Sequence, residues 1–180
     1  SGMCLLQGKP DGAPEIVHRT GQLYLCLGQE DRVDLKAMVD ENIRLFSAMQ
    51  MKETTIRNHI PAGTLAKADT NMVNLVFRNL ILNSIKFTET GGLVDISAST
   101  HDDGLVKIAV ADNGVGIEPE VQGILFDKTS GYSTRGTANE KGTGLGLILC
   151  KEFVEKNGGK IWLESKPGEG TTFFFTLKKA

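Results

Sequence analysis

Apolar residues recur along the chain with two different periods, and these periods predict where helices and strands lie. A helical period runs through residues 35–50, directly behind Asp34, a residue type that caps helices well. Asp69 has the same place before a second helix, residues 70 to about 87, whose apolar residues cover most of its circumference. A third helical pattern spans residues 145–156. The second helix is therefore expected to be buried.

Alternation of apolar and polar residues predicts the strands. The clearest case is a hairpin of residues 94–100 and 105–111, joined by an Asp-Asp-Gly turn. The other expected strands are 22–27, 54–60, 160–165 and 171–177. This order predicts the α/β class, as a two-layer sandwich in which three helices cover one face of a mixed, mostly antiparallel sheet.

The start of the chain has a different composition. Residues 1–21 are rich in Gly, Pro and charged residues, and they open on Ser-Gly, which resembles the scar left by a protease site. We expect a scar and linker over residues 1–21 and a single domain over residues 22–180.

Charge and hydropathy narrow the classes of partner. With 20 basic and 22 acidic residues the net charge is -2, so no basic excess favours nucleic acid. No apolar run approaches the roughly 20 residues that span a bilayer. The 3 cysteines lie far apart and without metal-ligand spacing, as in reduced cytoplasmic proteins. We expect a cytoplasmic chain that is not inserted in a membrane and does not bind nucleic acid.

The helix predicted over residues 70–87 carries three polar residues on one face. Asn79, Asn83 and Lys86 lie at positions i, i+4 and i+7, within one narrow arc of an otherwise apolar helix. They form either a solvated edge or a ligand site, because burying unpartnered polar groups costs about 1 to 3 kcal/mol each. In a ligand site the amide oxygens suit a hard cation such as Mg²⁺, and the lysine suits a phosphate.

Two glycine-rich segments border predicted elements. Residues 112–117, DNGVGI, follow the hairpin and form either an ordinary turn or a site where the Asp112 carboxylate accepts a hydrogen bond from an exocyclic amine such as that of adenine. Residues 142–147, GTGLGL, lead into the third helix, where free backbone N–H groups bind anions. A dinucleotide-binding fingerprint with Glu164 as its acidic residue is the competing interpretation. Against it, a leucine occupies the place of the third glycine and no buried strand precedes the motif.

Four motifs, in this order, resemble the N, G1, F and G2 boxes of histidine kinase catalytic domains, which share the Bergerat fold with gyrase, Hsp90 and MutL. They are NLILNSIKFT at residues 79–88, DNGVGI at 112–117, Phe126, and GTGLGL at 142–147. The resemblance covers about residues 22–178 and ends on GTTFFFTL. Four boxes occurring together are far more specific than any one of them alone.

By position, the resemblance implies a metal and phosphate site on the long helix. Asn83 would bind Mg²⁺, Asn79 would lie beside the phosphates of ATP, and Lys86 would neutralise their charge. The polar stretch 123–141 would be the lid over ATP, in which Arg135 either contacts the γ-phosphate or is a solvated surface residue. Asn79, Lys86 and Arg135 are thus the expected catalytic residues. Weaker lid candidates are Lys128 and Lys141.

The resemblance also implies a base site. Asp112 would accept a hydrogen bond from the adenine amino group, and Phe87 and Ile117 would flank the base. The family often has a second phenylalanine after Phe126, which this chain lacks, and Ser84 replaces the commoner alanine, a change that is harmless in size. The other expected nucleotide-binding positions are Gly114, Gly116 and Phe126 and, around the phosphates, Gly142, Thr143, Gly144, Leu145 and Gly146.

A histidine kinase needs an acceptor histidine on a helix, and none of the 3 histidines fits. His18 lies in the expected linker, His59 ends a predicted strand, and His101 lies at the hairpin turn. The resemblance therefore implies the ATP-binding domain of a two-component sensor, which passes the γ-phosphoryl of Mg-ATP to a histidine on a phosphoacceptor domain outside this chain. Expected partners are that helical domain, a response regulator receiver domain and, for the full-length protein, a second copy. This chain is expected to be cytoplasmic, and anchoring of the full-length protein in the bacterial inner membrane stays open.

Two other functions stay open. One is an ATPase or serine kinase of the same superfamily, although hydrolytic members carry a glutamate four residues before the metal-binding asparagine, where this chain has Asn79. An amide takes no proton at neutral pH, so it cannot activate water as a base. The other is a nucleotide-responsive docking module without catalysis, which the intact boxes disfavour.

Overall fold

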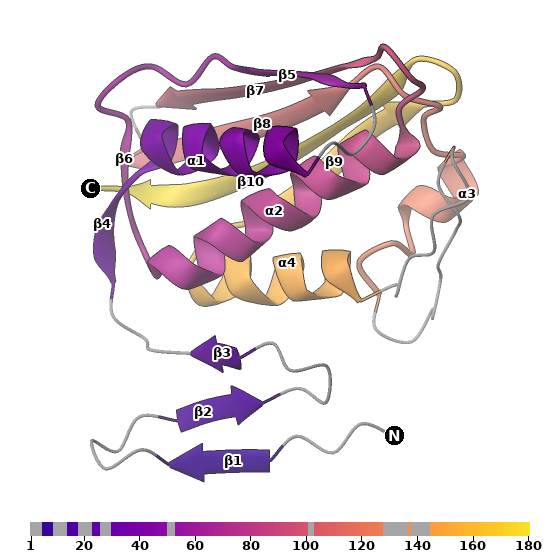
Figure 1. Ribbon diagram of the computed structural model, residues 1–180. Coiled ribbons are helices and arrows are strands. Elements are labelled where there is room, and N and C mark those ends of the chain that lie inside the picture. The colour runs from indigo at the N-terminus through magenta and orange to yellow at the C-terminus, as the bar shows by residue number, and fades with distance from the viewer. Residues whose placement is uncertain are drawn as a thin grey trace.

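The computed structural model describes one main sheet with helices on one side, and a small sheet of N-terminal strands (Figure 1). The described residues are 5–8, 14–17, 23–25, 30–49, 53–100, 103–127, 137 and 145–180, with side chains described from residue 30 onwards.

Seven strands form the main sheet, in the order β4-β6-β10-β8-β7-β5, and β9 also pairs with β10. Their bounds are β4 Asp31–Asp34, β5 Thr55–Asn58, β6 Leu65–Ala68, β7 Leu93–Thr100, β8 Leu105–Asp112, β9 Ile161–Lys166 and β10 Gly170–Lys179. Every pairing is antiparallel except that of β5 with β7. The predicted mixed, mostly antiparallel sheet is therefore confirmed.

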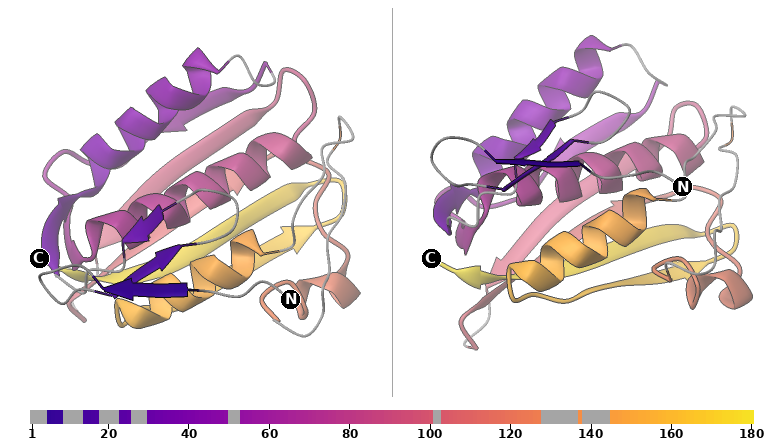
Figure 2. Two further views of the ribbon diagram at one scale, coloured as in Figure 1. Left: turned by 60° about the horizontal axis from the view of Figure 1, so that its bottom comes forward. Right: turned by 90° about the horizontal axis from the view of Figure 1, so that it is seen from below.

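Three helices cover one face of this sheet, and a short fourth helix lies at its edge (Figures 1 and 2). Both predicted caps form, since Asp34 accepts a hydrogen bond from the Ala37 amide at 3.0 Å and Asp69 accepts one from the Met72 amide at 2.9 Å. The middle helix, α2, contacts both α1 and α4, which explains why it is apolar on so many sides. The bounds are α1 Leu35–Ala48, α2 Thr70–Phe87, α3 Pro119–Gln122 and α4 Gly146–Lys156.

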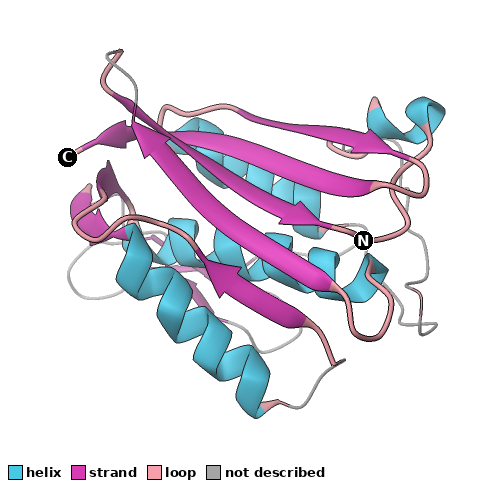
Figure 3. Cartoon of the chain, turned by 90° about the horizontal axis from the view of Figure 1, so that it is seen from above, coloured by secondary structure: helices cyan, strands magenta, loops and turns pink. Residues whose placement is uncertain are grey.

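The core lies between the helices and the inner face of the sheet. Phe175 of β10 is fully buried and meets Phe77 of α2 edge to face, with ring centroids 5.3 Å apart. The preceding residue, Phe174, points to the opposite, uncovered face of the sheet, where it stacks on Trp162. Figure 3 shows the sheet from this uncovered side. Nζ of Lys107 lies 4.3 Å from the Phe174 ring centroid, so a cation covers part of this aromatic pair.

The N-terminal strands differ from the sequence expectation. Strands β1 Leu5–Gly8, β2 Pro14–Val17 and β3 Leu23–Leu25 form a separate antiparallel sheet. The strand predicted at residues 22–27 thus exists as β3 but is not part of the main sheet. Two strands also lie within residues 1–21, where short apolar runs are hidden in a composition rich in turn residues. The linker and domain limits themselves stay a prediction.

Strands β4 and β6 carry no strong sequence signal. Each has four residues, and they bury only Val33 in β4 and the small residues Ala66 and Ala68 in β6. They pair with each other, and β6 pairs with the end of β10, so their place depends on partners far away in the sequence.

Candidate functional site

The C-terminal half of α2 presents the polar face that the sequence predicts. Asn79, Asn83 and Lys86 are all half-buried there. The Asn79 side chain donates from Nδ2 to the Leu75 carbonyl at 2.9 Å, which directs Oδ1 away from the helix backbone. That oxygen faces Gly146, the first residue of α4, since a Cβ on this glycine would lie 2.9 Å from it. The predicted N box and G2 box therefore meet at this point.

Asn83 and Lys86 differ in their partners. Among the residues that the structure describes, the Asn83 amide makes no hydrogen bond, so its oxygen is available to a ligand or metal. Nζ of Lys86 lies 4.7 Å from the centroid of the Phe87 ring. The Lys86 carbonyl accepts a hydrogen bond of 3.0 Å from the amide of Thr137, a described residue of the predicted lid. Thr137 therefore contacts the end of α2.

Asp112 ends β8 with its carboxylate half-buried. Its Oδ1 accepts hydrogen bonds from the backbone amides of Gly114 at 3.0 Å and Thr171 at 3.2 Å. Burial raises the pKa of Asp112, while the Gly114 amide, the Ser84 hydroxyl and the Thr171 amide act to lower it. The Ser84 hydroxyl is close enough to the carboxylate to act on its pKa, but no hydrogen bond of ordinary geometry joins the two. Asp112 is thus a partly desolvated acid with fixed orientation.

The loop after Asp112 is held between α2 and the β9–β10 hairpin. On one side the Val115 amide donates to the Phe87 carbonyl at 3.1 Å, and a Cβ on Gly114 would lie 2.3 Å from the same oxygen. On the other side a Cβ on Gly116, whose φ is +71°, would lie 2.1 Å from the Lys166 carbonyl oxygen. Both glycines are therefore required by close backbone approach.

Two residues that sequence reasoning missed complete this anchorage. The Ser165 hydroxyl accepts a hydrogen bond from the Ile117 amide at 2.9 Å, and it lies 2.8 Å from the Thr171 hydroxyl. Gln122 of α3 donates from Nε2 to the carbonyls of Ile117 at 2.8 Å and Ser165 at 3.0 Å. The sequence did hold a signal for Ser165: it lies on the same face of its strand as the inward residues Ile161 and Leu163, where a polar residue is unusual.

The structure brings together the predicted residues of α2, Asp112 and its loop, and Gly146. Phe126 follows α3 and packs against the core, and Leu145 is exposed just before α4. His59 hydrogen-bonds Asp95 at 2.8 Å, away from these residues. The following predicted residues lie outside the described residues: His18, His101, Lys128, Arg135, Lys141, Gly142, Thr143 and Gly144.

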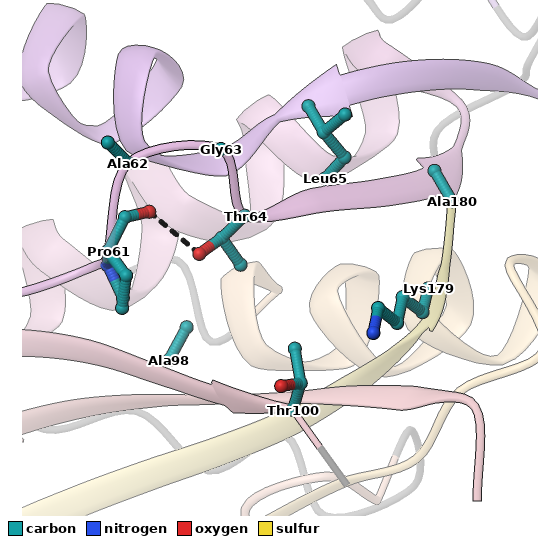
Figure 4. A pocket seen from close by; sticks show the side chains of 9 residues that line it. All are labelled: Pro61, Ala62, Gly63, Thr64, Leu65, Ala98, Thr100, Lys179 and Ala180. Carbon is teal, nitrogen blue, oxygen red and sulfur yellow. Dashed lines mark hydrogen bonds between the residues drawn. The ribbon is translucent and has the colours of Figure 1, made fainter. Parts of the chain in front are cut away.

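A cavity of about 300 Å³ lies at the opposite end of β10 and is separate from this site (Figure 4). It is formed by the turn between β5 and β6, by Ala98 and Thr100 of β7, and by the end of the chain. The Thr64 hydroxyl donates to the Pro61 carbonyl at 2.7 Å and so closes one side of it. None of the predicted site residues lines it.

Comparison with protein families shows to which family the chain belongs. The family model of the histidine kinase-, DNA gyrase B-, and HSP90-like ATPases matches residues 68–180, more than half of the chain. This chain belongs to that family. The matched part of this ATPase domain includes α2, the loop after β8 and α4, and so all the described residues of the site.

The relatives of this ATPase domain include sensory kinases, and histidine kinases are among the solved structures that resemble it. The adaptive-response sensory kinase SasA of Prochlorococcus marinus is 42% identical over 112 residues, which cover 61% of this chain and 29% of that relative. The catalytic domain of histidine kinase ThkA has 25% identity and a TM-score of 0.69, covering 83% of this chain and 95% of that one. Full-length ShkA in complex with AMPPNP has 26% identity and a TM-score of 0.68, covering 86% of this chain and 32% of that one.

The domain is therefore homologous to the catalytic domains of sensor histidine kinases. It spans less than half the length of the curated relatives that it matches. Within the described residues, none of the helices is both long and apolar enough to cross a membrane.

The close approach at Gly116 generates a stability prediction. Gly116→Ala should lower the free energy of unfolding by about 2 to 5 kcal/mol, because overlap with the Lys166 carbonyl adds about 1 to 3 kcal/mol to about 1 to 2 kcal/mol for the left-handed backbone. Gly168→Ala is the matched control, since its φ is +77° but nothing lies within 4 Å of its Cβ position. Urea unfolding of both variants measures the difference, and equal losses would contradict the close approach.

Proposed function

We propose that this chain is the ATP-binding catalytic domain of a sensor histidine kinase. Mg-ATP binds between the C-terminal half of α2, the loop after β8 and the N-terminus of α4, and its γ-phosphoryl passes to a histidine on a helical phosphoacceptor domain outside the chain. The observation that carries the proposal is the half-buried Asp112 carboxylate, held by two backbone amides beside the polar face of α2.

Asp112 is the proposed recognition residue for the base. An ionised carboxylate only accepts hydrogen bonds, and it therefore selects a purine edge that donates, such as the amino group of adenine, over the carbonyl of guanine. Phe87 and Ile117 are both half-buried. They flank the base in this proposal. Gly114 and Gly116 stay candidates for contact with the nucleotide, and their close approach to the backbone of α2 and β9 holds the loop in place.

The N-terminus of α4 is the proposed phosphate site. Asp34 and Asp69 cap α1 and α2, whereas α4 begins at Gly146 without a side-chain cap. The amides of its first turn can therefore meet a phosphate, and the helix dipole favours the negative charge. Contact between Gly146 and Asn79 supports the proposal, because it joins this helix end to the polar face of α2.

Asn83 is the proposed ligand of Mg²⁺. Protein sites often hold this ion through one or two side chains and the phosphates of the substrate. The donor set fits, because the Asn83 amide oxygen is a hard ligand and the amide has no hydrogen-bond partner among the described residues. When bound, the ion neutralises phosphate charge. Lys86 adds to this neutralisation, and Arg135 stays a candidate for the γ-phosphate.

Transfer to a histidine fits the residue at position 79. Asn79 takes no proton at neutral pH, so it cannot act as a base toward water. A neutral imidazole is already a good nucleophile, and positioning and charge neutralisation are then the main demands on the site. We propose the phosphoacceptor domain of the same protein and a response regulator receiver domain as partners, and a homodimer as the full-length assembly. The ShkA complex with AMPPNP supports nucleotide binding by this fold.

Base recognition by Asp112 generates the first functional prediction. Calorimetric titration should show binding of ATP and ADP and much weaker binding of GTP. Asp112→Asn should weaken ATP binding at least tenfold, since hydrogen bonds to charged groups contribute about 1.5 to 3 kcal/mol. Asp103→Asn changes an exposed carboxylate in the β7–β8 turn and should leave binding unchanged. Equal affinity for ATP and GTP would contradict the role of Asp112.

Phosphoryl transfer leads to the second functional prediction. With ATP labelled at the γ-phosphate, the chain alone should hydrolyse ATP very slowly and should not label itself. Added phosphoacceptor domain should become labelled on a histidine, in an acid-labile and alkali-stable linkage. Asn83→Ala should abolish transfer by removing the metal ligand, whereas Asn71→Ala, an exposed position of the same helix, should not. Rapid ATP hydrolysis that Asn83→Ala removes would instead favour the ATPase function.

A further inference from the structure

Ser84 has a side chain that folding alone does not explain. It lies on α2 next to Asn83, is fully buried, and its hydroxyl has no hydrogen-bond partner. Only one other buried side-chain atom in the described part of the chain shares this condition, the hydroxyl oxygen of Thr54. An unpartnered buried hydroxyl destabilises the folded state relative to a methyl group, so alanine would suit this position better for folding.

The Ser84 hydroxyl is close enough to the Asp112 carboxylate to act on its pKa. Oδ1 of that carboxylate already accepts from the Gly114 and Thr171 amides, at 3.0 and 3.2 Å. The Ser84 hydroxyl lowers the pKa of Asp112, as a donor close to a carboxylate does, although the geometry is not that of a formed hydrogen bond. Forming this hydrogen bond requires a movement of one of the two side chains.

The helix backbone at Ser84 cannot supply that movement easily. The Thr88 hydroxyl donates to the Ser84 carbonyl at 2.6 Å, and Thr88 is itself fully buried at the end of α2. The Phe87 carbonyl beside it holds the loop after Asp112. The adjustable parts are thus the hydroxyl rotor of Ser84 and the carboxylate of Asp112, and both respond to a ligand that binds the carboxylate.

We propose that Ser84 is a positioning residue for base recognition, which donates a hydrogen bond to Asp112 when the amino group of an adenine nucleotide binds the same carboxylate. This inference rests on the proposed function. The Ser84 donor favours the ionised carboxylate, which only accepts hydrogen bonds, and it holds that carboxylate in one direction. Binding of a base with an amino group at this edge is therefore strengthened. The Ser84 hydroxyl thus stabilises the complex with nucleotide, while in the chain alone it lowers the free energy of unfolding.

The test is Ser84→Ala, measured for both stability and binding. Without ligand the variant should unfold at the same or a higher urea concentration than the original chain. Its affinity for ATP should fall about 3- to 10-fold, the range for one hydrogen bond. Its affinity for purine riboside triphosphate, which lacks the amino group, should not change. A merely structural effect of the substitution would lower the affinities for both nucleotides alike.

Thr54→Val is the matched control, because it removes the other unpartnered buried hydroxyl. It should also keep or raise stability, but it should leave the affinities for both nucleotides unchanged. Unchanged ATP affinity in Ser84→Ala, while Asp112→Asn still loses ATP, would overturn the role of Ser84 alone. Equal losses for both nucleotides would overturn it too. Failure of the original chain to bind ATP would overturn the proposed function instead.

Discussion

The partial burial of the Asp112 carboxylate is the constraint on which the rest of the site depends. Burial raises its pKa, and three donors around it act against that rise. Backbone must come very close to supply two of them, and for that reason Gly114 and Gly170 lie beside it. A Cβ on Gly170 would be 2.0 Å from the Asp112 carbonyl oxygen. The end of α2, the loop after β8 and the start of β10 are therefore fixed relative to one another by this one acid.

Two buried asparagines outside the site find their hydrogen-bond partners within the fold. Asn157 accepts from the Asp69 amide at 2.7 Å and donates to the Phe153 carbonyl at 2.7 Å, so it links the end of α4 to the start of α2 with its bonds made. Asn42 donates to Asn74 across α1 and α2 at 2.8 Å. At Ser84, in contrast, a buried hydroxyl lies beside the site without a hydrogen-bond partner. This is expected where a ligand supplies the missing interaction.

The sequence predicted the elements whose signals are local. Asp69 and the period behind it define α2 without reference to the rest of the chain, and the hairpin of β7 and β8 is similarly self-contained. Strands β4 and β6, and the parallel pairing of β5 with β7, could not be predicted, because short strands take their place from distant partners. The four boxes predicted which residues form a nucleotide site; that role stays a prediction, and the structure brings the described residues of these boxes together. The roles of Gln122, Ser165 and Ser84 became visible only through contacts between α3, β9, α2 and the loop after Asp112.

The most direct test compares the unfolding of the original chain and Asp112→Asn across pH. Since burial raises the pKa of Asp112 above its ordinary 3.8, the folded state binds this proton more tightly than the unfolded state. The stability that this provides is present below 3.8 and is lost as pH rises through the folded-state pKa. Without nucleotide, Asp112→Asn should therefore be more stable at pH 7 by a margin that shrinks on acidification, and a saturating ATP analogue should reverse the order. An original chain that is more stable than Asp112→Asn at pH 7 without nucleotide would contradict the account.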